Sequence, residues 1–119
     1  MLKGERQSEA TAKLIIGVYI LRILSQETAH GNKLAAEIKK RTQGVYTPNT
    51  NALYPLLRLL EEKGYIAGEW DNVDTRSKRV YKITEAGLAR MPYLEEMLKE
   101  RLKEIEKKTA ILRADLGLV

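Results

Sequence analysis

A mainly helical α+β fold is predicted by three features of this chain of 119 residues. Helical periodicity of the apolar residues marks four segments, which are 8–24, 33–42, 48–63 and 84–119. Two strand-like segments, 65–70 and 79–83, lie between the last two helices, and the polar turn segment 71–78 joins them. Three helices, a two-stranded wing and a long final helix are the order of a winged helix-turn-helix fold.

The first predicted helix, residues 8–24, is apolar on nearly every side. Its apolar residues are Leu14, Ile15, Ile16, Val18, Ile20, Leu21 and Ile23. Such a helix must be covered from more than one direction, and we expect a second subunit to cover Leu14, Val18 and Leu21. The next helix, residues 33–42, has Asn32 as its expected cap.

The third predicted helix, residues 48–63, has one face suited to a core and another suited to a polar partner. Thr47 is its expected cap, Pro48 suits its first turn, and Gly64 suits the left-handed position that ends a helix. At about 100° per residue, the inward stripe consists of Leu53, Leu56, Leu57 and Leu60. The polar residues predicted to face outward are Thr47, Asn49, Thr50, Asn51, Tyr54 and Arg58.

The residue types on this outward face suit the recognition of nucleic acid. An arginine such as Arg58 can fork onto guanine, and an asparagine such as Asn51 can pair with the edge of adenine. Judged on this segment alone, an ordinary solvated helix face is an equal alternative. Pro55 is expected to bend the helix, because it removes one backbone donor.

The distribution of charge favours the same interpretation. The chain carries a net charge of +5, and 31% of its residues are charged. Residues 1–83 hold 14 basic and nine acidic residues, whereas residues 84–119 hold seven of each. The positive excess therefore lies in the segment that contains the predicted reading helix, which favours an anionic partner.

The final predicted helix begins after Thr84, its expected cap, and carries a long apolar seam. Met91, Leu98, Ile105 and Leu112 recur every seven residues, and Leu94, Leu102 and Leu116 widen the stripe. We expect this seam to join two copies of the chain. The alternative is that the helix folds back on its own domain. Pro92 either kinks the helix or marks a later start.

Enzymatic and metal-binding functions find no support in the sequence. Cysteine is absent, and His30 is the only histidine, so neither a thiolate site nor a histidine-based metal site or catalytic triad can be built from one chain. The apolar run 14–21 is too short to span a bilayer, and Glu5 and Glu9 before it do not suit a signal peptide. We therefore expect a cytoplasmic protein without a cofactor.

Trp70, the only tryptophan, is predicted to end the first strand of the wing. We expect it to fill a small packing site under the wing, as aromatic residues commonly do. The alternative is an aromatic wall of an effector pocket at a dimer centre. Tyr19 and Tyr93 are better placed for such a pocket if the first and last helices form its walls.

Three segments together resemble the PadR family of bacterial and archaeal transcriptional regulators. They are His30-Gly31-Asn32-Lys33-Leu34-Ala35, the run from Asn51 through Leu53-Tyr54-Pro55 to Ile66, and Arg79-Val80-Tyr81-Lys82-Ile83-Thr84-Glu85-Ala86-Gly87. The run with Leu-Tyr-Pro is fairly specific, whereas Thr-Glu-Ala-Gly also occurs in other winged-helix regulators. The sequence departs from the family at Thr47-Pro48-Asn49-Thr50-Asn51-Ala52, where Ser-Pro-Gly-Thr is common.

The resemblance implies a DNA-binding winged-helix domain at residues 1–83, a dimerisation helix at 84–119, and repression of a nearby promoter. It implies that Arg76, Lys78 and Arg79 of the wing contact the phosphates that flank the reading helix. Family members often respond to phenolic acids or lipophilic drugs, which implies a small aromatic or lipophilic effector. The competing hypothesis is a winged-helix module that binds another protein and not DNA.

Overall fold

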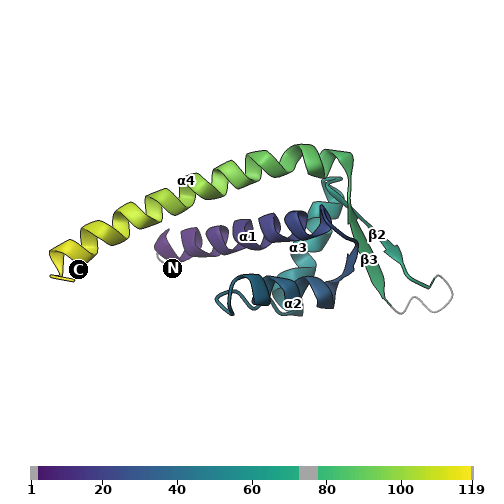
Figure 1. Cartoon of the computed structure of the whole chain (residues 1–119), viewed down its shortest axis with the longest axis horizontal. Coiled ribbons are helices and arrows are strands. Elements are labelled where there is room, and N and C mark those ends of the chain that lie inside the picture. The colour runs from purple at the N-terminus through teal and green to yellow at the C-terminus, as the bar shows by residue number, and fades with distance from the viewer. Residues whose placement is uncertain (1–2, 73–77, 119) are drawn as a thin grey trace.

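The computed structural model describes residues 3–72 and 78–118 of the chain. The elements follow in the order α1 (Lys3–Leu24), β1 (Ala29–His30), α2 (Gly31–Arg41), α3 (Thr50–Glu62), β2 (Ile66–Trp70), β3 (Arg79–Ile83) and α4 (Glu85–Asp115). Figure 1 shows this winged helix, with α4 running beside α1 and the wing projecting at one end. The predicted fold class is confirmed.

Helix α1 is the centre of the packing, because α4 covers one of its sides and α2 and α3 cover another (Figure 1). The core joins α1 to the other elements through side chains that are fully buried. They include Ile20, Leu21, Ile23, Leu34, Ile38, Leu53, Leu57 and Ile66. The all-round apolar character of α1 is therefore satisfied largely within one chain.

This packing corrects part of the predicted dimer interface. Leu21 is 0% exposed and Val18 is 2% exposed in the single chain, so neither side chain has surface left for a partner. Leu14 is half-buried. The prediction assigned these residues to a partner because the sequence did not reveal that α4 folds back along α1.

The wing belongs to a three-stranded antiparallel sheet in which β3 lies between β1 and β2. Strands β2 and β3 pair from Ile66↔Ile83 to Trp70↔Arg79. Strand β1 adds the pairs Ala29↔Tyr81 and His30↔Val80. Because β1 leads directly into α2, backbone hydrogen bonds connect the start of α2 to the base of the wing.

Two helix starts differ from the predictions. Asn49 caps α3, since its side-chain oxygen accepts from the backbone N–H of Ala52 at 3.0 Å. The predicted cap, Thr47, is therefore wrong, and α3 begins two residues later than predicted, because the Asn49 side chain satisfies a free backbone N–H of the first turn. Helix α2 begins at Gly31 with His30 at the cap position, so Asn32 lies in the first turn and is not the cap.

Helix α4 begins as predicted, with the Thr84 hydroxyl accepting from the backbone N–H of Gly87 at 3.1 Å. The same hydroxyl donates to the carbonyl of Gly64 at 2.6 Å, and the Thr84 backbone N–H donates to the carbonyl of Tyr65 at 3.1 Å. A β-carbon at Gly87 would collide with that Tyr65 carbonyl, so this position requires glycine. The start of α4 is thereby fixed to the turn that follows α3.

Pro92 lies inside α4 and does not delay its start. Farther along the helix, the Arg101 guanidinium donates to the Thr11 hydroxyl of α1 at 2.8 Å. Within the described ranges, none of the helices combines the length and apolar character needed to cross a bilayer.

Candidate nucleic-acid interface

The outward face of α3 carries most of the polar side chains that the sequence assigned to it. Leu53, Leu57 and Leu60 point into the core. Thr50, Asn51 and Arg58 are exposed, and so are Thr47 and Asn49 in the approach to the helix. Of these, Asn49 has its side-chain oxygen engaged in the cap, which leaves Thr50, Asn51 and Arg58 on the helix, and Thr47 before it, as polar groups that can meet a partner.

Tyr54 lies at the border between this outward face and the core, and together with Arg58 it lines a hollow between α3 and the wing. It is half-buried and packs against the core, and a β-carbon placed at Gly31 would lie 2.9 Å from its hydroxyl oxygen. Tyr54 lies about 60° around the helix from the buried Leu57 and about 40° from the exposed Arg58, so its role as a DNA contact stays a prediction. Gly31 thus provides the space that lets Tyr54 close the gap between α3 and α2.

An apolar flank on the same face was missed by the sequence analysis. Ala52, Pro55 and Leu59 are all exposed, and Leu59 retains 44% of its surface. Their spacing of three and four residues places them on one side of α3, next to Asn51. Helical periodicity alone places these three apolar residues together, but they belong neither to the inward leucine stripe nor to the polar residues of the outward face.

The Arg79 side chain is about one-third exposed and lies against the body of the protein, where it is paired with another side chain. Its guanidinium donates to the Glu61 carboxylate at 2.6 Å and lies 5.5 Å from the centre of the Trp70 ring. The hydrogen bond from Arg79 to Glu61 is the main reason that the pKa of Arg79 is raised. The role of a free phosphate contact, which the family resemblance implied for Arg79, is therefore corrected.

Two neighbours, Gly68 and Tyr81, line the site that the Arg79 side chain occupies. A β-carbon at Gly68 would come within 2.6 Å of the Arg79 Nε, so glycine there leaves the path of the guanidinium open. Tyr81 is buried beside it, and burial raises the pKa of the Tyr81 phenol. The Tyr81 phenol is neutral near pH 7 even at its ordinary pKa, so it contributes no negative charge near Arg79.

Lys78 and Arg76 are the two other wing residues predicted to contact phosphates. Lys78 is exposed and has no ion pair among residues 3–72 and 78–118. Its backbone N–H donates to the Asp71 carboxylate at 3.2 Å, which closes the described base of the wing. Arg76 lies outside the described residues.

A hollow of about 1000 Å³ lies between the start of α2, the reading helix α3 and the wing. We call it the α3–wing hollow. Its basic side chains are Lys33, Arg58, Lys78 and Arg79, and its acidic side chains are Glu61 and Glu62. Trp70 also lines it and is 41% exposed, so Trp70 does not fill a closed packing site under the wing as predicted.

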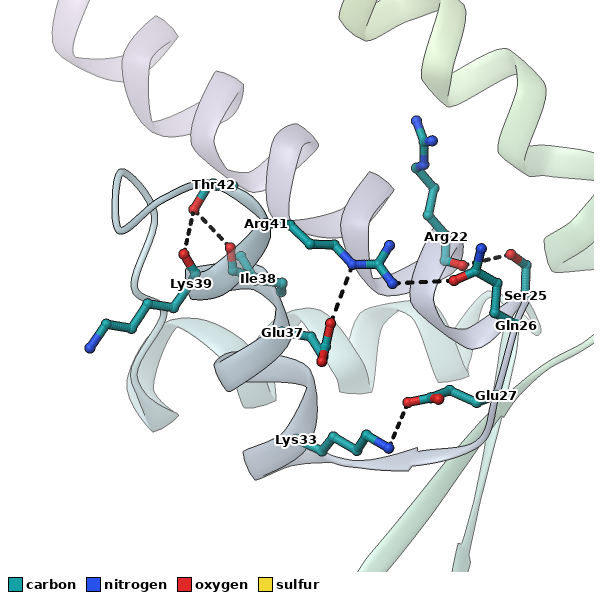
Figure 2. A network of polar contacts seen from close by, with 10 residues as sticks. All are labelled: Arg22, Ser25, Gln26, Glu27, Lys33, Glu37, Ile38, Lys39, Arg41 and Thr42. Carbon is teal, nitrogen blue, oxygen red and sulfur yellow. Dashed lines mark hydrogen bonds and ion pairs between the residues drawn. The ribbon is translucent and has the colours of Figure 1, made fainter.

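Polar contacts fix the start and end of α2 relative to the preceding turn (Figure 2). Lys33 bonds to Glu27 at 2.7 Å, and this hydrogen bond raises the pKa of Lys33. Arg41 reaches both Glu37 at 3.4 Å and Gln26 at 3.2 Å. The turn between α1 and α2 is therefore tied to α2 on two sides, which holds one wall of the hollow in place.

The predicted dimerisation residues of α4 separate into two groups. Met91 and Leu94 pack against the core of their own chain, and Leu98 is half-buried. Leu102 and Ile105 are each 41% exposed and Leu112 is 61% exposed. The alternative that the helix folds back thus accounts for its first half, while the second half keeps an uncovered apolar seam.

Within the described ranges, no group of three or more His, Cys, Asp or Glu side chains could hold a metal ion.

The sequence comparison then decides the family. Residues 20–93 match the Transcriptional regulator PadR-like family. The chain belongs to this family. Its named relatives are transcriptional regulators and not enzymes, which agrees with the sequence analysis.

Two regulators are similar to this chain in sequence. Transcriptional regulator Rv3488 of Mycobacterium tuberculosis (strain ATCC 25618 / H37Rv) is 31% identical over 90 residues, which cover 76% of this chain and 81% of that protein. Transcriptional regulator YqjI of Escherichia coli (strain K12) is 36% identical over 90 residues, covering 71% of this chain. The chain spans about two fifths of the length of YqjI, since the match covers 41% of it.

Solved structures agree with the fold. A PadR family transcriptional regulator from Eggerthella lenta DSM 2243 superposes with a TM-score of 0.62 at 28% identity, covering 89% of this chain and 94% of the other. Bacillus subtilis PadR in complex with operator DNA superposes with a TM-score of 0.57 at 20% identity, covering 65% and 43%. The second likeness concerns the fold alone.

Proposed function

We propose that this chain is a cytoplasmic, dimeric DNA-binding repressor that inserts α3 into the major groove of a near-palindromic operator. The observation that carries the proposal is the exposed face of α3, where Thr50, Asn51 and Arg58 lie beside the α3–wing hollow. Membership of a family of transcriptional regulators supports it. An α-helix with such a face fits the width of the major groove.

Base recognition is divided between two flanks of α3. On the polar flank, Arg58 forks onto guanine and Asn51 pairs with adenine, while Thr50 bonds to a base or a phosphate. On the apolar flank, Ala52 and Leu59 meet the methyl group of thymine, which is the apolar feature of the major groove. An operator that contains A·T pairs beside a G·C pair would satisfy both flanks.

The α3–wing hollow receives the phosphate backbone next to the groove. The exposed Lys78 lines it at the base of the wing, so a phosphodiester strand between α3 and the wing would meet positive charge there. Such contacts set the position of the protein without reading sequence. They also make binding fall steeply with salt, because each phosphate contact releases counterions.

Two copies of the chain are joined by α4. The exposed apolar residues in its second half are Leu102, Ile105, Ile111, Leu112 and Leu116. A contiguous seam of this kind is typical of a subunit interface. In this arrangement residues 1–83 bind DNA and residues 84–119 dimerise, and the two α3 helices enter grooves about 34 Å apart.

A small aromatic or lipophilic effector is part of the proposal. Tyr93 is 69% exposed near the start of α4, and Tyr19 is half-buried on α1, so these two helices carry the aromatic side chains that such an effector would contact. Apolar pockets with a few polar groups at subunit junctions commonly bind such molecules.

The proposal is tested by selecting bound fragments from the native genome and then titrating the recovered duplex by fluorescence anisotropy at several salt concentrations. We expect tight, salt-dependent binding of the selected duplex and weaker binding of a scrambled duplex. Light scattering is expected to give twice the mass of one chain. A protein that binds neither duplex but captures another protein through α4 would support the interaction-module hypothesis and overturn this one.

A further inference from the structure

One guanidinium connects the reading helix to the wing. Arg79 on β3 donates to Glu61 in the last turn of α3 at 2.6 Å and stacks on Trp70 of β2 at 5.5 Å. Trp70 and Arg79 are directly opposite in the register of the hairpin. We call these three residues the Glu61–Arg79–Trp70 cluster.

The cluster lies where the wing leaves the body of the protein. All three side chains line the α3–wing hollow, and both members of the ion pair are about one-third exposed. Asp71, which follows Trp70 in the chain, accepts a hydrogen bond from the backbone N–H of Lys78 at 3.2 Å. Lys78 is therefore also held at the base of the wing. The position of Lys78 relative to α3 therefore depends on how Arg79 is held.

We propose that Glu61 is a positioning residue for DNA binding, which holds Arg79 and thereby sets the angle between the wing and α3. This inference rests on the proposed function. In this role Arg79 is not a phosphate contact, and Lys78 makes the wing's contact with DNA. Glu61 favours DNA binding although its own charge repels phosphate.

A purely Coulombic account makes the opposite prediction. Removing a carboxylate that lines a DNA-binding surface would strengthen binding on every duplex. Glu62 provides a matched control, because it is the next residue of α3, lines the same hollow, and has no ion pair among the residues that the structure describes. The two substitutions Glu61→Ala and Glu62→Ala change the net charge equally.

The test measures DNA affinity of the full chain by anisotropy with the selected duplex. We expect Glu62→Ala to bind roughly twofold tighter, because one unfavourable charge is lost. We expect Glu61→Ala to bind roughly threefold weaker, the size of effect that a partly exposed ion pair supports. Arg79→Lys keeps the positive charge but loses the forked bond and the stack, so we expect it to weaken binding as well.

A double variant separates positioning from a general structural role. Lys78→Ala is expected to cost less affinity when Glu61 is already alanine, because a misplaced Lys78 has little contact left to lose. Thermal unfolding of each variant at one protein concentration identifies any loss that comes from unfolding. Tighter binding by Glu61→Ala, or full additivity of the two substitutions, would overturn the inference. A wild-type chain that binds no duplex would instead overturn the proposed function.

Discussion

At the scale of single residues, Arg58 and Lys78 line the same hollow, and the proposed function gives them different chemical tasks. Arg58 is an exposed side chain of α3, where it can reach the edge of a base. Lys78 is exposed at the base of the wing, where its backbone N–H donates to the Asp71 carboxylate. A planar guanidinium with paired donors discriminates between bases, whereas a lysine acts as a point charge on any phosphate.

The first prediction concerns this division. Arg58→Ala should reduce the difference in affinity between operator variants, by about 1–3 kcal/mol at the position that it reads. Lys78→Ala should weaken all duplexes alike and reduce the salt slope by about one phosphate contact. Anisotropy titrations on matched and single-substituted duplexes from low to high salt measure both effects. An equal loss on every sequence for both variants would contradict the assignment.

The second prediction concerns Leu59 and the apolar flank of α3. Replacing the thymines of the operator by deoxyuridine removes only methyl groups, so the wild-type chain should bind the altered duplex more weakly. Leu59→Ala should lose affinity for the thymine duplex and show a smaller difference between the two duplexes, since burying one methyl contributes about 0.8 kcal/mol. Identical affinities of the wild-type chain for both duplexes would exclude methyl recognition.

At the scale of elements, the sequence was sufficient to predict some helix starts and strands but not others. The strands β2 and β3 and the cap Thr84 were predictable, because alternation and a single strong cap candidate left few choices. The start of α3 was not, because Thr47 and Asn49 are both good caps two residues apart. Strand β1 has two residues, too few for any alternating pattern, and it forms only because β3 pairs with it.

The candidate site shows the same limit. Exposure of Thr50, Asn51 and Arg58 follows from helical periodicity, which is local information. The burial of Tyr54 depends on Gly31, and the pairing of Arg79 depends on Glu61, which is 18 positions away in the sequence. Contacts between distant segments are set by the packing of whole elements, so no local pattern announces them.

The third prediction concerns the junction at the start of α4. Thr84→Ala removes the hydroxyl that accepts from Gly87 and donates to Gly64, so it should lower the free energy of unfolding by about 1–2 kcal/mol. Thr84→Ser keeps both hydrogen bonds and serves as the control. Gly87→Ala should be more damaging, because its added methyl meets backbone and not a movable side chain. Chemical denaturation at a fixed protein concentration compares the three variants, and equal stability of Thr84→Ala and Thr84→Ser would contradict this role.

At the scale of the whole molecule, the wing and the uncovered part of α4 lie at opposite ends. The molecule measures 61 × 28 × 27 Å, with the wing at one end and the end of α4 at the other (Figure 1). The positive excess lies in residues 1–83, and the uncovered seam lies in the second half of α4. In the proposed function, the end with the wing binds DNA while the second half of α4 binds a second copy of the chain.

The fourth prediction concerns the seam. Ile105→Glu should weaken dimerisation roughly a hundredfold, because an unpaired charge in a dry interface costs several kcal/mol. Lys103→Glu introduces the same carboxylate two residues away on the charged side of the helix and should leave the dimer intact. Sedimentation or light scattering over a range of protein concentrations measures both. A wild-type chain that stays monomeric at every concentration would refute the seam as a subunit interface.

The glycine contact at the start of α4 has a mechanical consequence. Because Gly87 and Thr84 attach this helix directly to the turn after α3, α4 acts as a stiff arm about 46 Å long at about 1.5 Å per residue. If α4 tilted by about 5° about its start, its far end would move by about 4 Å, and the attached turn would rotate with the helix. In the proposed dimer, a molecule that wedges between the two α4 helices would therefore change the spacing of the two α3 helices without touching either one.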